Sequence, residues 1–128
     1  MMLGIELRAR REALGLTQRL LAADLGNAQA TVSQWETGVR AIPADVEQRI
    51  RDLEERMESL VPDAVDALEA LDGAGQEGAV LHVWADDAAF WAAHPDLDGT
   101  PAVVHRVAMA RAAAEVEPAG LQVRLVTP

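Results

Sequence analysis

Apolar residues recur at helical spacing at the start of the chain. Leu3, Leu7 and Leu14 fall along one stripe of a helix, and Gly15 follows the last of them. Such spacing is typical of an amphipathic helix, and a glycine often stands just beyond a helix end. The pattern therefore predicts a helix over residues 3–14 with the three leucines on its inward side.

A second, shorter helix is predicted in the stretch "TQRLLAADLG". Thr17 provides a side-chain oxygen that can cap the helix, and Leu21, Ala22 and Leu25 lie on its inward side. Gly26 ends the helix, because glycine can adopt the positive φ that a tight turn at this point requires.

A third helix is predicted to begin one or two residues later, over about residues 28–37. Val32 and Trp35 lie on its inward side, Gly38 closes it, and Pro43 marks a boundary beyond it. Three short helices with a glycine turn between the second and the third are typical of a helix-turn-helix. A DNA-binding function follows as the first hypothesis.

The stretch "LRARREALGLTQRLLAADLGNAQATVSQWETG" resembles the lambda-repressor-like family of helix-turn-helix proteins (Cro-type, or xenobiotic-response-element family), over about residues 5–43. The segment "LGLTQ", Gly26 and the segment "VSQWETG" carry much of the resemblance. Where the family often has serine as the N-cap of the third helix, this chain has Ala28. We therefore expect Asn27 to cap the third helix and to start it one residue early.

The resemblance implies that the third helix enters the major groove of DNA. Glutamine can bind adenine through two hydrogen bonds, and a small apolar side chain can contact a thymine methyl group. The alternative is that the outward polar residues only form a solvated helix face. The expected base contacts are Gln29, Ala30, Ser33 and Gln34, and the expected contacts to the DNA backbone are Thr17, Gln18, Asn27, Thr37 and Arg40.

The resemblance also implies a structural ion pair between Arg11 and Glu36. Arg11 lies on the apolar stripe of the first helix, and Glu36 lies at the inner end of the third. We expect the pair to tie these two helices together. We also expect Trp35 to pack between helices rather than to stack on DNA bases.

Beyond the helix-turn-helix, apolar residues follow the steps of a heptad repeat. The positions are Val46, Ile50, Leu53, Met57 and Leu60. A short coiled coil and packing within the chain fit this pattern equally well. Pro62 is expected to kink the helix or to start a new one. We assign residues 1–43 to the DNA-binding core, 44–72 to a helical extension and 73–79 to a linker.

Residues 80–128 are predicted to form a small α+β domain with the order strand, helix, helix, strand. The stretch "AVLHVWA" is a strand candidate, and "LQVRLV" alternates apolar and polar residues as a half-buried strand does. Asp86 is the expected cap of a helix that ends at His94, and a second helix is expected from Pro101 to about Val116. The predicted fold class is therefore mainly α with a small α+β domain.

Two strands and two helices are marginal as an independent domain, so we expect a second copy of the chain to complete it. The expected dimer interface comprises Leu81, Val83, Trp84, Leu121, Val123 and Leu125, with strands pairing across a two-fold axis. Over residues 5–127 the chain is also similar to the anti-CRISPR-associated, YdiL-like repressor group. That resemblance implies a homodimeric autorepressor that binds an inverted-repeat operator in double-stranded DNA.

The net charge of −10 at first argues against a nucleic-acid partner. Residues 1–44, however, hold five basic and four acidic residues, whereas the remaining 84 hold six and 17. Acidic residues far from the DNA oppose binding little, because the Debye length at physiological salt is about 8 Å. The chain has no cysteine and no apolar run long enough to span a membrane, so we expect a cytoplasmic protein.

An enzymatic function is not expected. No histidine lies at metal-ligand spacing, and neither a phosphate-binding loop nor a nucleophile elbow is present. We therefore predict no catalytic residue, no metal site and no cofactor. Two further readings stay open: an antitoxin whose tail masks a toxin protein, and a regulator that binds a ligand near Trp84 and Trp91. The residues that would otherwise suggest a metal or acid–base site are His82, His94, His105, Asp86, Asp87 and Asp96.

Overall fold

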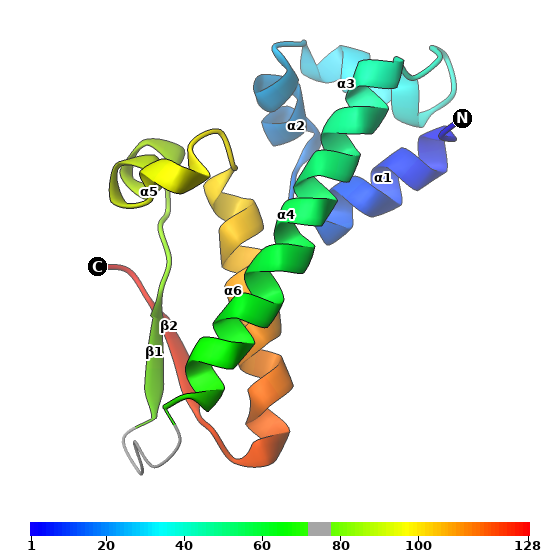
Figure 1. The fold of residues 1–128 in the computed structure, drawn as a ribbon. Coiled ribbons are helices and arrows are strands. Elements are labelled where there is room, and N and C mark those ends of the chain that lie inside the picture. The colour runs from blue at the N-terminus through cyan, green and yellow to red at the C-terminus, as the bar shows by residue number, and fades with distance from the viewer. Residues whose placement is uncertain (72–77) are drawn as a thin grey trace. The chain divides into compact units, whose positions relative to one another are not determined.

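A computed structural model describes residues 1–71 and 78–128 of the chain, and most of these residues are helical. They form two compact units, Met1–Glu55 and Arg56–Pro128. In chain order the elements are α1 (Gly4–Ala13), α2 (Gln18–Leu25), α3 (Gln29–Glu36), α4 (Ala44–Glu69), β1 (Ala79–His82), α5 (Asp87–Ala93), η2 (Pro95–Leu97), α6 (Ala102–Val116), η3 (Glu117–Ala119) and β2 (Val123–Val126) (Figure 1).

The boundary between the two units lies inside α4, whereas the sequence suggested bounds at residues 43 and 72. The predicted linker, 73–79, lies outside the described residues except for its last two positions, Gly78 and Ala79. Ala79 is already the first residue of β1.

Helix α1 buries Leu7 and Leu14 as predicted. The prediction that Leu3 also faces inward is wrong, because Leu3 is 56% exposed. It stands at the N-cap position with an extended backbone, and its N–H donates to the Glu6 carboxylate at 3.2 Å. The inward contact is made instead by Gly4, where the backbone of α1 closely approaches the end of α3.

The predicted start and end of α2 are confirmed. The Thr17 hydroxyl oxygen accepts the N–H of Leu20 at 3.0 Å, and Gly26 has a φ of +70°. The cap satisfies a backbone N–H that has no partner within the helix. Leu21 and Ala22 are buried on the inner side of α2, also as predicted.

Helix α3 begins later than the sequence suggested. Ala28, not Asn27, occupies the N-cap position, and no side chain caps the helix. Asn27 instead belongs to the end of α2, because its N–H donates to the carbonyl of Ala22 at 2.8 Å. The expected burial of Val32 and Trp35 is confirmed.

Helix α4 buries its heptad positions within the chain, which favours internal packing over a coiled coil between chains. Val46, Ile50 and Leu53 are buried in the first unit. In the second unit Met57 is buried and Leu60 is half-buried.

Pro62 does not start a new helix, which was one of the two expectations for it, because α4 runs through this residue without a break. Proline lacks the N–H that would bond to the carbonyl four residues earlier. Pro62 itself is exposed, so water can replace part of the lost hydrogen bonding.

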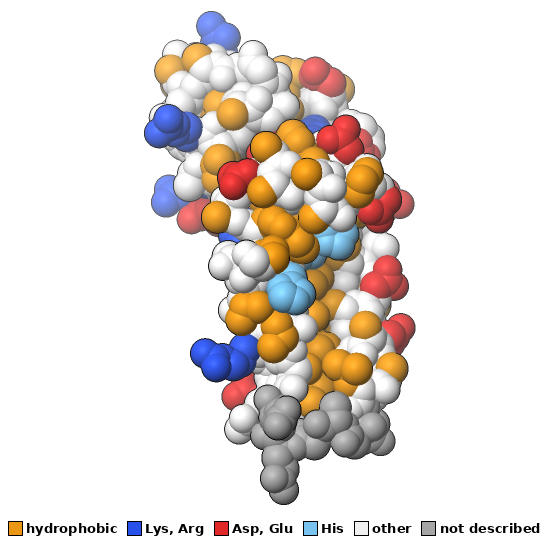
Figure 2. All heavy atoms as spheres, turned by 90° about the vertical axis from the view of Figure 1, so that its left-hand side faces the viewer, with side chains coloured by type: hydrophobic (Ala, Val, Ile, Leu, Met, Phe, Trp, Pro, Cys, Tyr) orange, Lys and Arg blue, Asp and Glu red, His pale blue; other side chains and the backbone are white. Residues whose placement is uncertain are grey.

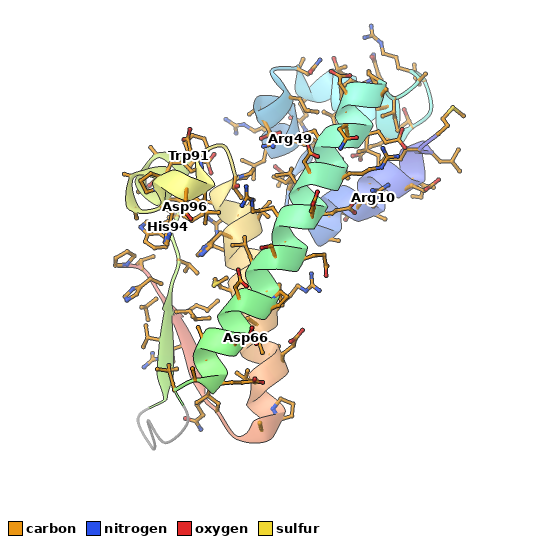
Figure 3. All side chains as sticks on the ribbon, in the orientation of Figure 1. Arg10, Arg49, Asp66, Trp91, His94 and Asp96 are labelled. Carbon is orange, nitrogen blue, oxygen red and sulfur yellow. The ribbon has the colours of Figure 1, made fainter. Side chains whose placement is uncertain are left out.

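Two ion pairs tie α4 to the short helices of the first unit. Arg10 of α1 donates from Nε to Glu54 at 2.9 Å, and Arg49 of α4 donates from Nε to Asp24 of α2 at 2.8 Å. Both arginines are labelled in Figure 3. These contacts connect the predicted helical extension to the helix-turn-helix within one compact unit.

The second unit contains a parallel two-stranded sheet. Ala79 of β1 lies opposite Val123 of β2, and His82 lies opposite Val126. Two helices and two short 3-10 helices connect the strands, and the unit also includes the last part of α4, so it differs from the four-element domain predicted. The predicted cap of α5 is confirmed, because the Asp86 carboxylate accepts the N–H of Ala89 at 2.8 Å.

The aromatic residues build the core beneath α5. Phe90, Leu97 and Ala102 are buried, with Trp84 and Trp91 packed against them. The Trp91 Nε1 donates to the carbonyl of Thr100 at 2.7 Å, so the indole polar atom is satisfied.

The sheet leaves apolar side chains uncovered. Val80 is 50% exposed and Leu125 is 38% exposed, so the strand predicted to be half-buried does not bury Leu125 on its apolar side. Leu125 stays accessible because only one other strand lies beside β2 among the described residues. Figure 2 shows hydrophobic side chains at the surface on the side of this unit that carries the strands and α5.

The close approach at Gly4 generates the first prediction. A Cβ at this position would lie 2.6 Å from the carbonyl oxygen of Trp35 and closer still to that of Glu36. Gly4→Ala should therefore lower the free energy of unfolding by about 1–3 kcal/mol, as overpacking does. Ala9→Ser, at an exposed position of the same helix, should cost less than about 0.7 kcal/mol. Urea denaturation compares the variants, and equal stability of Gly4→Ala and wild type would contradict the observed packing.

Candidate nucleic-acid interface

Helix α3 has a buried side and a polar side. Val32 and Trp35 are packed into the first unit. The opposite side presents short or polar side chains whose groups can reach the edges of bases. Of these residues Gln29, Ala30 and Thr37 are exposed, and Ser33 and Gln34 are half-buried.

Two expected contacts to the DNA backbone, Thr37 and Gln18, already donate side-chain hydrogen bonds within the protein. The Thr37 hydroxyl donates to the carbonyl of Ser33 at 3.0 Å, so a phosphate could take its hydrogen only if this bond broke. Gln18 donates from Nε2 to the Glu36 carboxylate at 3.0 Å, which leaves one amide hydrogen and the amide oxygen for another partner.

The other expected backbone contacts are more accessible. Thr17, Asn27 and Arg40 are all exposed. The backbone N–H of Arg40 donates to the carbonyl of Gln34 at 3.1 Å, which holds this loop against the end of α3. The backbone of Arg40, from which the guanidinium extends, is therefore held in place by α3.

Arg11 and Glu36 meet at the junction of the three helices. Arg11 donates from Nε to Glu36 Oε2 at 2.7 Å and from a terminal nitrogen to Oε1 at 3.0 Å. The side chains are only 9% and 4% exposed. The other terminal nitrogen of Arg11 donates to the carbonyl of Leu16 at 2.8 Å, at the start of α2. This bidentate geometry fixes orientation as well as distance.

The bond from Gln18 to Glu36 was not predicted from the sequence. It brings α2 into the same network, so one carboxylate is hydrogen-bonded from both α1 and α2. The only signal in the sequence was a long polar side chain, that of Gln18, at the start of α2. Nothing local indicated that its partner lies at the far end of the next helix.

The network lowers the pKa of Glu36 below its ordinary value of 4.5. Burial disfavours the charged carboxylate, but hydrogen bonds from Arg11 and Gln18 together outweigh this effect. The pKa of Arg11 is raised, chiefly by its hydrogen bond to Glu36. The pair is therefore fully charged at neutral pH.

The segment that contains this network and the polar side of α3 matches a known family. Residues 7–52 match the family model described as helix-turn-helix. This segment is a helix-turn-helix domain. It extends past the predicted core at residue 43 and takes in the first part of α4. A search of curated proteins finds no match.

The helix-turn-helix match supports a DNA-binding transcriptional regulator of the xenobiotic-response-element type. Regulators of this family are typically not enzymes. The described parts of the chain contain no cluster of three or more metal-ligating side chains. Within the same residues no helix combines the length and apolar character needed to cross a bilayer.

The histidines of the second unit take part in a ring cluster. His105 is buried, with its ring centroid 4.7 Å from that of Phe90 and 5.8 Å from that of His94. Burial, with smaller electrostatic contributions from the neighbouring His94 and Arg106, lowers the pKa of His105 to about 4. A neutral imidazole packed among rings fits a structural role for this residue.

The second prediction concerns the ion pair. Arg11→Ala leaves the Glu36 carboxylate buried without its main partner, so the free energy of unfolding at pH 7 should fall by about 3–5 kcal/mol. Arg8→Ala, which breaks an exposed pair with Glu12, should cost less than about 1 kcal/mol.

The effect of Arg11→Ala should also depend on pH. Because the pKa of Glu36 is lower in the folded than in the unfolded chain, the folded state binds fewer protons. The pair therefore stabilises fully above about pH 5 and loses its contribution as the pH falls through the lowered pKa. Urea denaturation from neutral to acidic pH should show wild type and Arg11→Ala converging. If wild type and Arg11→Ala differed by the same free energy of unfolding at every pH in this range, the lowered pKa of Glu36 would be contradicted.

Proposed function

We propose that the chain is a homodimeric transcriptional repressor that binds an inverted-repeat operator through α3 and regulates the operon that encodes it. The main support is the polar side of α3, which is held in place by the buried bonds from Arg11 and Gln18 to Glu36. Binding needs no catalytic step, because occupancy of a promoter site excludes the polymerase.

In this proposal base readout belongs to the polar side of α3. Two glutamines can each make paired hydrogen bonds to adenine, and a small side chain between them lets the helix approach a thymine methyl group. Contacts to the DNA backbone then fix the register of the protein on the duplex. The base-reading residues are Gln29, Ala30, Ser33 and Gln34, and the backbone-contacting residues are Thr17, Gln18, Asn27, Thr37 and Arg40.

The proposed dimer would form through the second unit. A two-stranded sheet is marginal alone, and parallel sheets are usually covered on both faces. Of the residues expected at the interface, Val83 is buried and Trp84 packs on Phe90, so these two serve the core of one chain. The exposed Val80 and Leu125 are better placed to contact a second copy.

A dimer would supply two recognition helices for two half-sites of an inverted repeat. Half-sites on one face of the duplex are separated by about one helical turn, or about 34 Å. An antitoxin would use the same DNA-binding domain but would cover the exposed strands with a different protein. Mass determination of the purified chain, alone and with proteins encoded beside it, separates the two arrangements.

The third prediction tests base readout. Gln29→Ala and Gln34→Ala should each weaken binding to the specific operator by about 1–3 kcal/mol per lost base contact, with little change for unrelated DNA. Neither side chain supports the core, so the melting temperature should stay within a few degrees of wild type.

Gln48→Ala provides the matched control, because Gln48 is an exposed glutamine on α4 that bonds to Asp52. Gel-shift titrations would use DNA from immediately upstream of the coding sequence. Equal operator affinities for Gln29→Ala, Gln34→Ala and Gln48→Ala would exclude α3 as the reading element.

The fourth prediction tests the dimer. Light scattering should show a dimer at micromolar concentration, and Val80→Glu should shift it to a monomer because a charge would be buried at the interface. Val39→Glu is the control, since Val39 is 73% exposed on the first unit. A monomeric wild type, or dimers of equal strength in both variants, would rule out this interface.

A further inference from the structure

The first unit has a net negative charge, with seven arginines against nine acidic residues over residues 1–55. A surface that attracts DNA must therefore arise from the arrangement of charges rather than from their sum. Most of the arginines are already neutralised by a nearby carboxylate. The ion pairs are Arg8–Glu12, Arg10–Glu54, Arg11–Glu36, Arg49–Asp24 and Arg51–Glu47.

Two arginines of this unit have no carboxylate within ion-pair distance in the described parts of the chain: Arg19 and Arg40. Both are exposed. By contrast, the acidic residues that lack an ion-pair partner in this unit lie on α4, except for Glu6 of α1. On α4 they are Asp45, Asp52 and Glu55. Arg19 lies on α2 and Arg40 in the loop after α3, so the free arginines and most of the free acids of this unit lie on different elements.

Both free arginines are connected to the last turn of α3. Gln18, the residue before Arg19, bonds to Glu36, and the backbone N–H of Arg40 bonds to the carbonyl of Gln34. Arg19 therefore lies in the turn of α2 whose preceding residue bonds to Glu36 of α3, and Arg40 lies in the loop held against the end of α3.

The helical position of Arg19 also places it on a side of α2 that does not face α4. Asp24 of the same helix binds Arg49 and so marks the side that faces α4. At 3.6 residues per turn, Arg19 projects about 140° around the helix axis from Asp24.

We propose that Arg19 is a phosphate-binding residue of the DNA interface and that, with Arg40, it supplies the arginine–phosphate attraction of each protomer. This inference rests on the proposed function. Arginine is well suited to phosphate because its guanidinium presents several N–H donors and keeps its charge. The remaining backbone contacts would come from neutral side chains and from backbone N–H groups.

The test measures the salt dependence of DNA binding by the full-length protein. The probe is the duplex enriched when the protein selects from a random-sequence library, with affinity measured by fluorescence anisotropy. Each lost arginine–phosphate contact makes the slope of log affinity against log salt less steep by about 0.9. A change of this size corresponds to roughly eightfold weaker binding per protomer at about 0.1 M salt, and the difference in affinity disappears near 1 M.

Arg19→Ala should show this decrease in slope, and Arg19→Lys should largely restore it because the charge is kept. Arg8→Ala and Arg51→Ala are matched controls, since both arginines are exposed but ion-paired, and their slopes should equal that of wild type. Melting temperatures of all variants should stay close together. An early-melting Arg19→Ala with an unchanged slope would instead assign Arg19 to the fold.

The outcomes separate this inference from the proposed function. If the library yields no enriched duplex, operator binding itself fails and the inference falls with it. If a duplex is enriched but Arg19→Ala retains the slope of Arg8→Ala, the regulator stands and the role of Arg19 is overturned. A decrease shared by Arg19→Ala and Arg40→Ala, and absent from both controls, supports the proposal.

Discussion

The buried ion pair between Arg11 and Glu36 is the interaction on which the DNA-binding domain depends. One guanidinium binds the carboxylate of α3 and a backbone carbonyl at the start of α2, and Gln18 adds a third bond to the same carboxylate. Charged groups are this deeply buried only when their hydrogen bonds are satisfied. The network therefore allows only a narrow range of positions for α3 relative to α1 and α2.

Close packing of α1 against the end of α3 also explains why the first residue of α1 has no side chain. Gly4 lets the backbone of α1 reach the carbonyl groups of Trp35 and Glu36, and any Cβ would collide with them. The ion pair and this backbone contact fix the end of α3 from one side. The outer polar side of α3 stays accessible, while contacts on the inner side hold the helix in place.

The positions of the unpaired charges in this protein say more about its electrostatics than the net charge of the chain does. The chain is strongly acidic, yet ion pairs neutralise most arginines of the first unit, and its free acids are concentrated on α4. Arg19 and Arg40, the two arginines of this unit without a carboxylate partner among the described residues, lie on α2 and in the loop that follows α3. At physiological salt, fields decay over about 8 Å, so the nearest charges decide whether a phosphate is attracted. The second unit differs in that its two parallel strands leave two apolar side chains, Val80 and Leu125, exposed.

The sequence by itself determined the features that depend on neighbouring residues. The Thr17 and Asp86 caps, the turn at Gly26 and the inward side of α3 follow from local hydrogen bonds, positive φ and helical period. Tertiary structure decided what local pattern leaves open. The sequence could not indicate that Gln18 bonds to Glu36, or that β1 and β2 pair in parallel and leave Leu125 exposed. Contacts between distant segments depend on how helices and strands pack, and periodicity specifies which side of an element is apolar but not what covers it.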